Sequence, residues 1–150
     1  MNGAGYNRTL VDVSLLVLRV VVGTIMAVHG AQKVFGFFGG KGLEAAINAL
    51  GVGPLGYLVA IGECFGGLGI IFGFLTRFSA ASNIVIMIGA IVMVHGKNGF
   101  FMQNGGFEYN LALIGLLVPI VLLGAGQYSI GRFLPLPKQA GSDRPIVPLE

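Results

Sequence analysis

Four long apolar runs dominate the pattern of hydrophobic and polar positions along this chain. About 20 residues of α-helix cross the roughly 30 Å hydrocarbon core of a bilayer, and each run reaches or approaches that length. The expected helices cover Val11–Phe35, Tyr57–Leu75, Phe78–His95 and Tyr109–Gly124. The pattern therefore predicts an all-α integral membrane protein, folded as a four-helix bundle with an antiparallel up-down course.

The segments between and after these runs complete the predicted organisation. Gly36–Gly56 contains an amphipathic stretch at residues 43–50, which predicts a short helix lying in the membrane interface. Residues 127–150 carry four prolines and are expected to have little structure of their own. We therefore predict a transmembrane domain at residues 1–132 and a flexible polar tail at residues 133–150.

Composition narrows the classes of function. Apolar residues make up 55% of the chain and charged residues only 10%, against about 25% charged in an ordinary soluble domain. Cys64 is the only cysteine, which excludes an intramolecular disulfide, a CxxC redox pair and a cysteine-rich metal site. No basic stripe is interleaved with aromatic residues, which argues against a nucleic-acid partner. The lipid bilayer is the partner that the composition predicts.

The distribution of basic residues predicts the orientation of the bundle. An even number of helices places both termini on one side of the membrane. That side carries five basic residues and the opposite loops carry three, so the positive-inside rule favours cytoplasmic termini. The five are Arg8, Arg77, Arg132, Lys138 and Arg144, and the three are Lys33, Lys41 and Lys97.

Six ionisable residues lie inside or at the edges of the apolar runs. An ionisable side chain in hydrocarbon costs about 2.5–3.5 kcal/mol on insertion scales, so such residues usually face a bundle interior or a wet cavity. Helix direction places five of them near the outer end of the bundle and leaves Arg19 about 20 Å deeper. Arg19 either lines the same inward face or extends its guanidinium to the cytoplasmic headgroups. The six are Arg19, His29, Lys33, Glu63, His95 and Glu108.

The five residues near the outer end of the bundle predict a wet, charged pocket that holds a quinone. Glu63 and His29 are the candidate catalytic residues, because both types can exchange protons near neutral pH in such a setting. The candidate residues for binding the quinone ring are Arg19, Lys33, His95, Phe100, Phe101 and Glu108.

Two other interpretations of these residues stay open. In the first, Glu63 pairs with Lys33 or His29 only to hold two helices together, and Glu108 only stabilises a helix start. In the second, His29 and His95 ligate a haem. The spacing of the two histidines does not specify haem ligation, and a histidine is more often hydrogen-bonded to a carboxylate. No residues predict a metal site.

The sequence resembles the DoxX family of small four-helix bacterial and archaeal membrane proteins. The resemblance covers nearly all of residues 14–131. It is carried by the combination of Arg19, His29-Gly30, Lys33, Glu63, Arg77 and Glu108 within the stretches LLVLRVVVGTIMAVHGAQKVFGFFGG, IGECFGGLGIIFGFLTRFSA, HGKNGFF and FEYNLALIGLLVPIVLLGAGQYSI.

The resemblance implies a multi-pass protein of a bacterial inner membrane or an archaeal plasma membrane. It further implies a redox-linked subunit of a quinone-associated assembly, such as a thiosulfate:quinone oxidoreductase, with other subunits or further copies of the chain as partners. The family supplies no catalytic residues to carry over to this sequence. A non-catalytic structural or assembly subunit of a larger energy-transducing complex is the alternative.

Overall fold

The computed structural model describes residues 8–51 and 53–133, and these ranges are helical and contain no β-strand. The helices are α1 (Arg8–Phe35), α2 (Leu43–Leu50), α3 (Leu55–Phe72), α4 (Thr76–Ala90) and α5 (Glu108–Leu123). A π-helical turn, Ile91–His95, and a 3-10 turn, Gly96–Asn98, prolong α4. Further 3-10 turns cover Phe37–Gly39, Met102–Asn104 and Ile130–Phe133. The predicted all-α class is confirmed.

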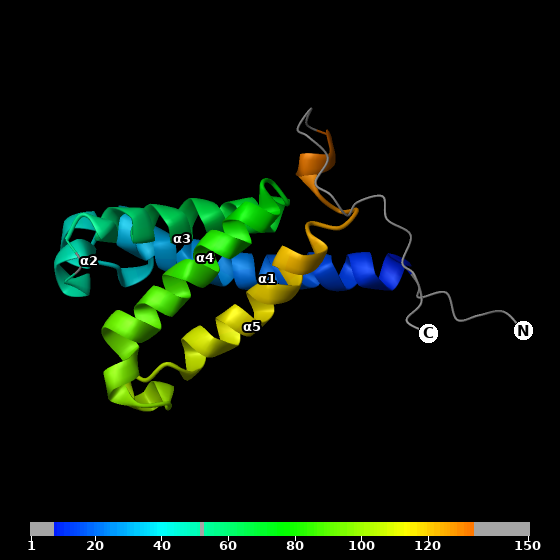
Figure 1. The fold of residues 1–150 in the computed structure, drawn as a ribbon. Coiled ribbons are helices and arrows are strands. Elements are labelled where there is room, and N and C mark those ends of the chain that lie inside the picture. The colour runs from blue at the N-terminus through cyan, green and yellow to red at the C-terminus, as the bar shows by residue number, and fades with distance from the viewer. Residues whose placement is uncertain (1–7, 52, 134–150) are drawn as a thin grey trace, which may run out of the picture.

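The long helices form two pairs that cross (Figure 1). Helix α1 packs mainly against α3, and α4 packs mainly against α5. The second pair lies obliquely across the first, joined to it by the α3–α4 contact. The buried core lies where the pairs cross, around Val22, Ile70, Ala80 and Leu117.

Three helical segments are long and apolar enough to cross a membrane. They cover Arg8–Phe35, Leu55–Phe72 and Thr76–Asn98, the last including the two turns after α4. Helix α5 is apolar but shorter, with 16 residues. Each of the four expected spans overlaps one of these helices, although α3 ends at Phe72 rather than at residue 75. The arrangement is compatible with a membrane bundle.

The surface of the helices is far more apolar than that of a soluble protein. Large apolar side chains cover the outside of the helices, whereas polar ones are buried between them. This surface suits hydrocarbon, which solvates apolar side chains but leaves an unpaired polar group unsatisfied. The buried polar residues are Arg19, Glu63, Thr76, Ser79, Asn83 and Asn110, and examples of the exposed apolar ones are Val17, Leu58, Phe65, Val85 and Leu122.

Glycines allow α1 and α3 to approach until their backbones touch. A Cβ atom on Gly30 would overlap the backbone of Cys64, and one on Gly67 would overlap the backbone of Ala27. One turn before Ala27 in α1, a Cβ on Gly23 would lie 2.7 Å from Cγ1 of Ile71. Small residues have this effect in membrane helices because packing, rather than the hydrophobic effect, drives their association.

A second set of glycines on α3 faces α4. Gly62 lies against Ile86, Gly66 against Asn83 and Gly69 against Ser79. Gly62 and Gly66 form a GxxxG pair that packs against α4 within the bundle. Helix α3 has a glycine face for each neighbour, which makes it the central element of the fold.

Replacing Gly30 by alanine tests the α1–α3 contact. The added methyl group has no room at the Cys64 backbone, so we expect the free energy of unfolding to fall by about 1–3 kcal/mol, as in other overpacked cores. The measurement is reversible unfolding in mixed detergent micelles.

The matched control is Gly115→Ala in α5, where a Cβ would meet nothing within 4 Å. That change leaves stability the same or raises it by up to about 1 kcal/mol through helix propensity. Equal stability of the Gly30→Ala and Gly115→Ala variants would contradict the close contact.

Candidate functional site

An ion pair lies within the α1–α3 interface. The ammonium group of Lys33, near the end of α1, donates a hydrogen bond to Oε2 of Glu63 in the middle of α3. The Glu63 side chain is only 4% exposed and that of Lys33 is 25% exposed. The close approach of the helices at Gly30 and Cys64 brings the two residues within reach. The pair therefore puts both signs of charge inside an apolar helix bundle.

A histidine and a tyrosine lie beside this ion pair. His29 is four residues before Lys33 and so shares its face of α1. The Tyr109 hydroxyl, from the first turn of α5, lies 3.4 Å from Nε2 of His29, and their ring centroids are 6.0 Å apart. We call His29, Lys33, Glu63 and Tyr109 the outer cluster.

The outer cluster has a closed side and an open side. Glu63 is buried, whereas Lys33 and Tyr109 are half-buried and His29 is exposed. A molecule approaching from the open side meets an imidazole, a phenol hydroxyl and an ammonium group, with a carboxylate behind them. Such a set can donate hydrogen bonds to carbonyl oxygens and move protons between them.

Tyr109 is the member of the outer cluster that sequence reasoning missed. A tyrosine at a helix start has an ordinary apolar role at a membrane edge, so its type gave no signal. Helix direction could have indicated it, because Tyr109 lies at the start of the last helix, at the same end of the bundle as His29. Only the packing of α5 against α1 shows that the two side chains meet.

The structure places Arg19 away from the outer cluster, at the level where α3 ends. Arg19 is 1% exposed. Its Nε donates to the Ile70 carbonyl at 3.0 Å, and its Nη2 donates to Ile71 at 3.0 Å and to Tyr128 at 2.8 Å. Its Nη1 donates to the Ala125 carbonyl. The guanidinium thus satisfies carbonyls at the end of α3, where a cation is favourable. The alternative in which Arg19 extends to the headgroups is wrong.

The segment that follows α5 is held in place, partly by Arg19. The Gln127 N–H donates to the Asp12 carboxylate at 3.0 Å, and the Gly131 N–H donates to the Gly73 carbonyl at 3.2 Å. The expectation that residues 127–150 have little structure of their own is therefore wrong for 127–133. The predicted tail beyond residue 133 lies outside the described residues.

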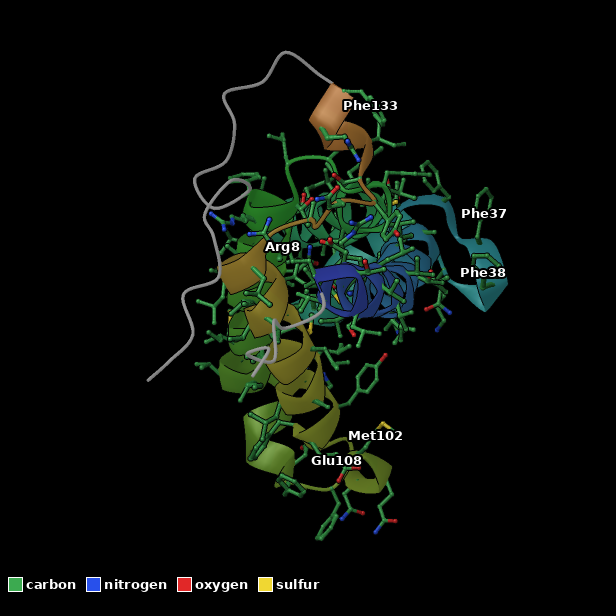
Figure 2. The ribbon with its side chains drawn as sticks, turned by 90° about the vertical axis from the view of Figure 1, so that its right-hand side faces the viewer. Arg8, Phe37, Phe38, Met102, Glu108 and Phe133 are labelled. Atoms are coloured by element: carbon green, nitrogen blue, oxygen red, sulfur yellow. The ribbon has the colours of Figure 1, made fainter. Side chains whose placement is uncertain are left out.

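The other candidate residues lie in or at the edges of the connection between α4 and α5. His95 Nδ1 lies 2.7 Å from the Gly105 carbonyl, and Phe100 packs edge to face against Phe101 and Phe107. Figure 2 places Glu108 and the neighbouring Met102 apart from Phe37 and Phe38, which lie between α1 and α2. Among the described residues, no hydrogen bond, ion pair or ring contact links the side chains of His95, Phe100, Phe101 or Glu108 to those of the outer cluster. Their predicted role in binding stays a prediction.

The histidines and the cysteine are also candidates for metal or haem ligation or for redox chemistry. Within residues 8–51 and 53–133, no group of three or more His, Cys, Asp or Glu residues is placed to hold a metal ion. His29 contacts the Tyr109 hydroxyl, and His95 bonds to the Gly105 carbonyl of its own loop. Cys64 is buried between α1 and α3 as a small packing residue.

Comparisons with known proteins find a family and several relatives. The sequence model of the DoxX family matches residues 14–96, more than half of the chain. "Inner membrane protein YqjF" of Escherichia coli is 31% identical over 128 residues, which cover 85% of this chain and 96% of that protein. "Putative oxidoreductase CatD" of Bacillus subtilis is 31% identical over 137 residues, which cover 87% of this chain and 94% of that protein.

A third likeness is partial. A "Glycerol-3-phosphate acyltransferase" of Chlorobium luteolum is 27% identical over 106 residues, which cover 69% of this chain and 43% of that enzyme. Because less than half of the enzyme is matched, this likeness carries no functional argument. No solved structure matches the chain.

Replacing Arg19 by lysine tests its structural role. An ammonium group keeps the charge but cannot reach four carbonyls spread over α3 and residues 125–128. Each buried carbonyl left unpaired costs about 1–3 kcal/mol, so we expect the thermal midpoint in detergent to fall clearly. Arg8→Lys, at the exposed start of α1, is the control and leaves the midpoint unchanged. Equal midpoints for the two variants would show that the four carbonyls do not depend on the guanidinium.

Proposed function

The chain belongs to the DoxX family of membrane proteins, and on that premise we propose that it is a redox-linked membrane subunit that binds a quinone-type ring at the outer cluster. The observation that carries this proposal is the Lys33–Glu63 ion pair inside an apolar bundle, with His29 and Tyr109 on its open side. A quinone brings two carbonyl oxygens that need hydrogen-bond donors and, on reduction, protons. The outer cluster offers both on a surface otherwise suited to a lipid tail.

Each member of the outer cluster has a role in this proposal. Lys33 and the Tyr109 hydroxyl donate hydrogen bonds to the quinone oxygens, and the positive charge of Lys33 stabilises negative charge on the reduced ring. Glu63 and His29 hold and transfer protons. With a single cysteine the chain has no CxxC redox pair, so electrons come from a partner subunit or from a bound cofactor. The relative whose printed name includes oxidoreductase supports a redox role at the level of the family.

The same pair supports a second function, that of a structural or assembly subunit. Lys33–Glu63 joins α1 to α3 at one end of their interface, as Arg19 does at the other, and an internal tie needs no ligand. In that role the exposed apolar faces of the helices contact other subunits of a larger complex. Quinone binding requires the charges of Lys33 and Glu63, whereas a structural tie between the helices does not.

A double substitution separates the two functions. Lys33→Met with Glu63→Leu replaces the ion pair by apolar side chains of similar size, which often keeps or raises stability. We expect the double variant to fold and to lose quinone binding by at least about tenfold, the value of one charge-assisted hydrogen bond. Binding is measured by titrating purified protein with a short-chain quinone. Unchanged binding in the double variant would contradict the redox function and favour the structural one.

A single substitution tests Tyr109 with little disturbance of packing. Tyr109→Phe removes only the hydroxyl, so we expect quinone affinity to fall by about fivefold, as for one neutral hydrogen bond. Tyr57→Phe, at the exposed start of α3, is the control and leaves affinity unchanged. Equal affinities would remove Tyr109 from the site.

The arrangement of the bundle in the membrane is a second part of the proposal. We propose an antiparallel up-down bundle with both termini in the cytoplasm and α2 in the opposite interface. Along α1, residues 30, 27 and 23 contact residues 64, 67 and 71 of α3 in turn, which supports opposite helix directions. Ile47 of α2 is buried against Gly56, which supports an α2 that lies on the bundle rather than crossing the membrane.

Single-cysteine labelling in intact cells tests this orientation. Native Cys64 is buried, so a membrane-impermeant maleimide is expected to leave it unlabelled. A cysteine at Lys97 is expected to react from outside the cell, whereas one at Arg8 reacts only after the cells are opened. The reverse pattern would overturn the proposed orientation.

A further inference from the structure

Charge is distributed unevenly between the two ends of the described helices. At the end where α1 starts and α5 stops, four arginines face one aspartate: Arg8, Arg19, Arg77 and Arg132 against Asp12. At the other end, three lysines are matched by three glutamates: Lys33, Lys41 and Lys97 against Glu44, Glu63 and Glu108. The excess positive charge therefore lies at one end, where it favours anionic lipid headgroups.

A shallow pocket of about 370 Å³ opens at this basic end. Its walls come from α1, from the end of α3 and from residues 127–133, and they are mostly apolar. Leu16, Ile71, Phe72, Ile130 and Phe133 supply the apolar surface, and Arg19 and Arg132 supply two guanidinium groups. The pocket thus combines a hydrocarbon-like wall with positive charge.

The two arginines contribute in different ways. Arg19 donates hydrogen bonds to four backbone carbonyls and places a buried positive charge beside the pocket. Arg132 is exposed, uses Nη1 for the Gln127 carbonyl at 3.0 Å and stacks 5.3 Å from the centre of the Phe133 ring. Among the described residues Arg132 has no carboxylate partner. It therefore lies beside the pocket, and its other N–H groups have no hydrogen-bond partner among residues 8–51 and 53–133.

The depth of the pocket suits a lipid. Arg19 satisfies carbonyls in the last turn of α3, so the pocket lies where a membrane helix ends and headgroups meet acyl chains. In Figure 1 the segment after α5, which ends at Phe133, projects from this end of the bundle. Figure 2 labels Phe133 on the same segment, and Phe133 is one of the residues that line the pocket.

We propose that this pocket binds one anionic phospholipid. Its phosphate accepts hydrogen bonds from Arg132, and the upper part of an acyl chain lies against Leu16, Phe72 and Phe133. A guanidinium suits this task because its planar N–H groups match the geometry of phosphate oxygens. The bound lipid would fasten residues 127–133 to the bundle at a point distinct from the outer cluster. This inference does not depend on quinone binding.

Lipid binding by the full chain tests the proposal. Protein in a mild detergent is titrated with phosphatidylglycerol, and bound lipid is counted by native mass spectrometry. We expect Arg132→Gln to weaken the tightest binding event about tenfold, as for the loss of one charge-assisted hydrogen bond. Arg8→Gln removes the same charge from the same end but lies outside the pocket, and it is expected to weaken binding by less than about twofold.

Three outcomes would overturn this proposal. Equal weakening by Arg132→Gln and Arg8→Gln would show diffuse attraction by surface charge. Phosphatidylcholine binding as tightly as phosphatidylglycerol would show that the negative charge is not recognised. Displacement of phosphatidylglycerol by inorganic phosphate at equal concentration would assign the pocket to free phosphate instead of a lipid.

Discussion

The close contact between α1 and α3 is the constraint on which the rest of the structure depends. Gly30 and Gly67 remove the side chains that would otherwise separate the two backbones, at Cys64 and Ala27. Two polar contacts across this interface depend on that proximity: the Lys33–Glu63 ion pair and the hydrogen bonds of Arg19. Lys33 reaches Glu63 near one end, and Arg19 reaches the last carbonyls of α3 at the other. With a wider separation neither could be satisfied within the bundle, and hydrocarbon offers no alternative partner.

The two ends of the α1–α3 interface differ in whether a ligand can reach their polar side chains. Arg19 is enclosed and its donors are directed to backbone carbonyls, so its contribution is to fold stability. Lys33 and Glu63 satisfy each other, but Lys33 is partly exposed and stands beside the exposed His29 and the Tyr109 hydroxyl. A ligand can approach these groups without breaking the helix contact. For this reason we assign ligand binding and proton transfer to the outer cluster, and a role in fold stability to Arg19.

The sequence predicts the helices well because apolar length and helix direction are local properties. They identified four apolar helices, and they placed Lys33 and Glu63 at a common depth. They did not identify Tyr109, whose meeting with His29 depends on how α5 crosses α1. They also assigned Arg19 to a ligand or to headgroups, because its acceptors are backbone carbonyls that residue types do not reveal. The order of residues 127–133 was missed for the same reason, since backbone groups of this segment bond to Asp12, Arg19 and Gly73.

Difference infrared spectroscopy of the protein in lipid bilayers tests the central claim most directly, since it reports on the Glu63 carboxylate itself. Spectra are recorded before and after a quinone is added, and again with the Glu63→Gln protein. We predict that the quinone changes a carboxylate stretching band of the native protein and that this change is absent from the Glu63→Gln protein. A native difference spectrum with no carboxylate change, or one that persists in the Glu63→Gln protein, would contradict a quinone site at the outer cluster.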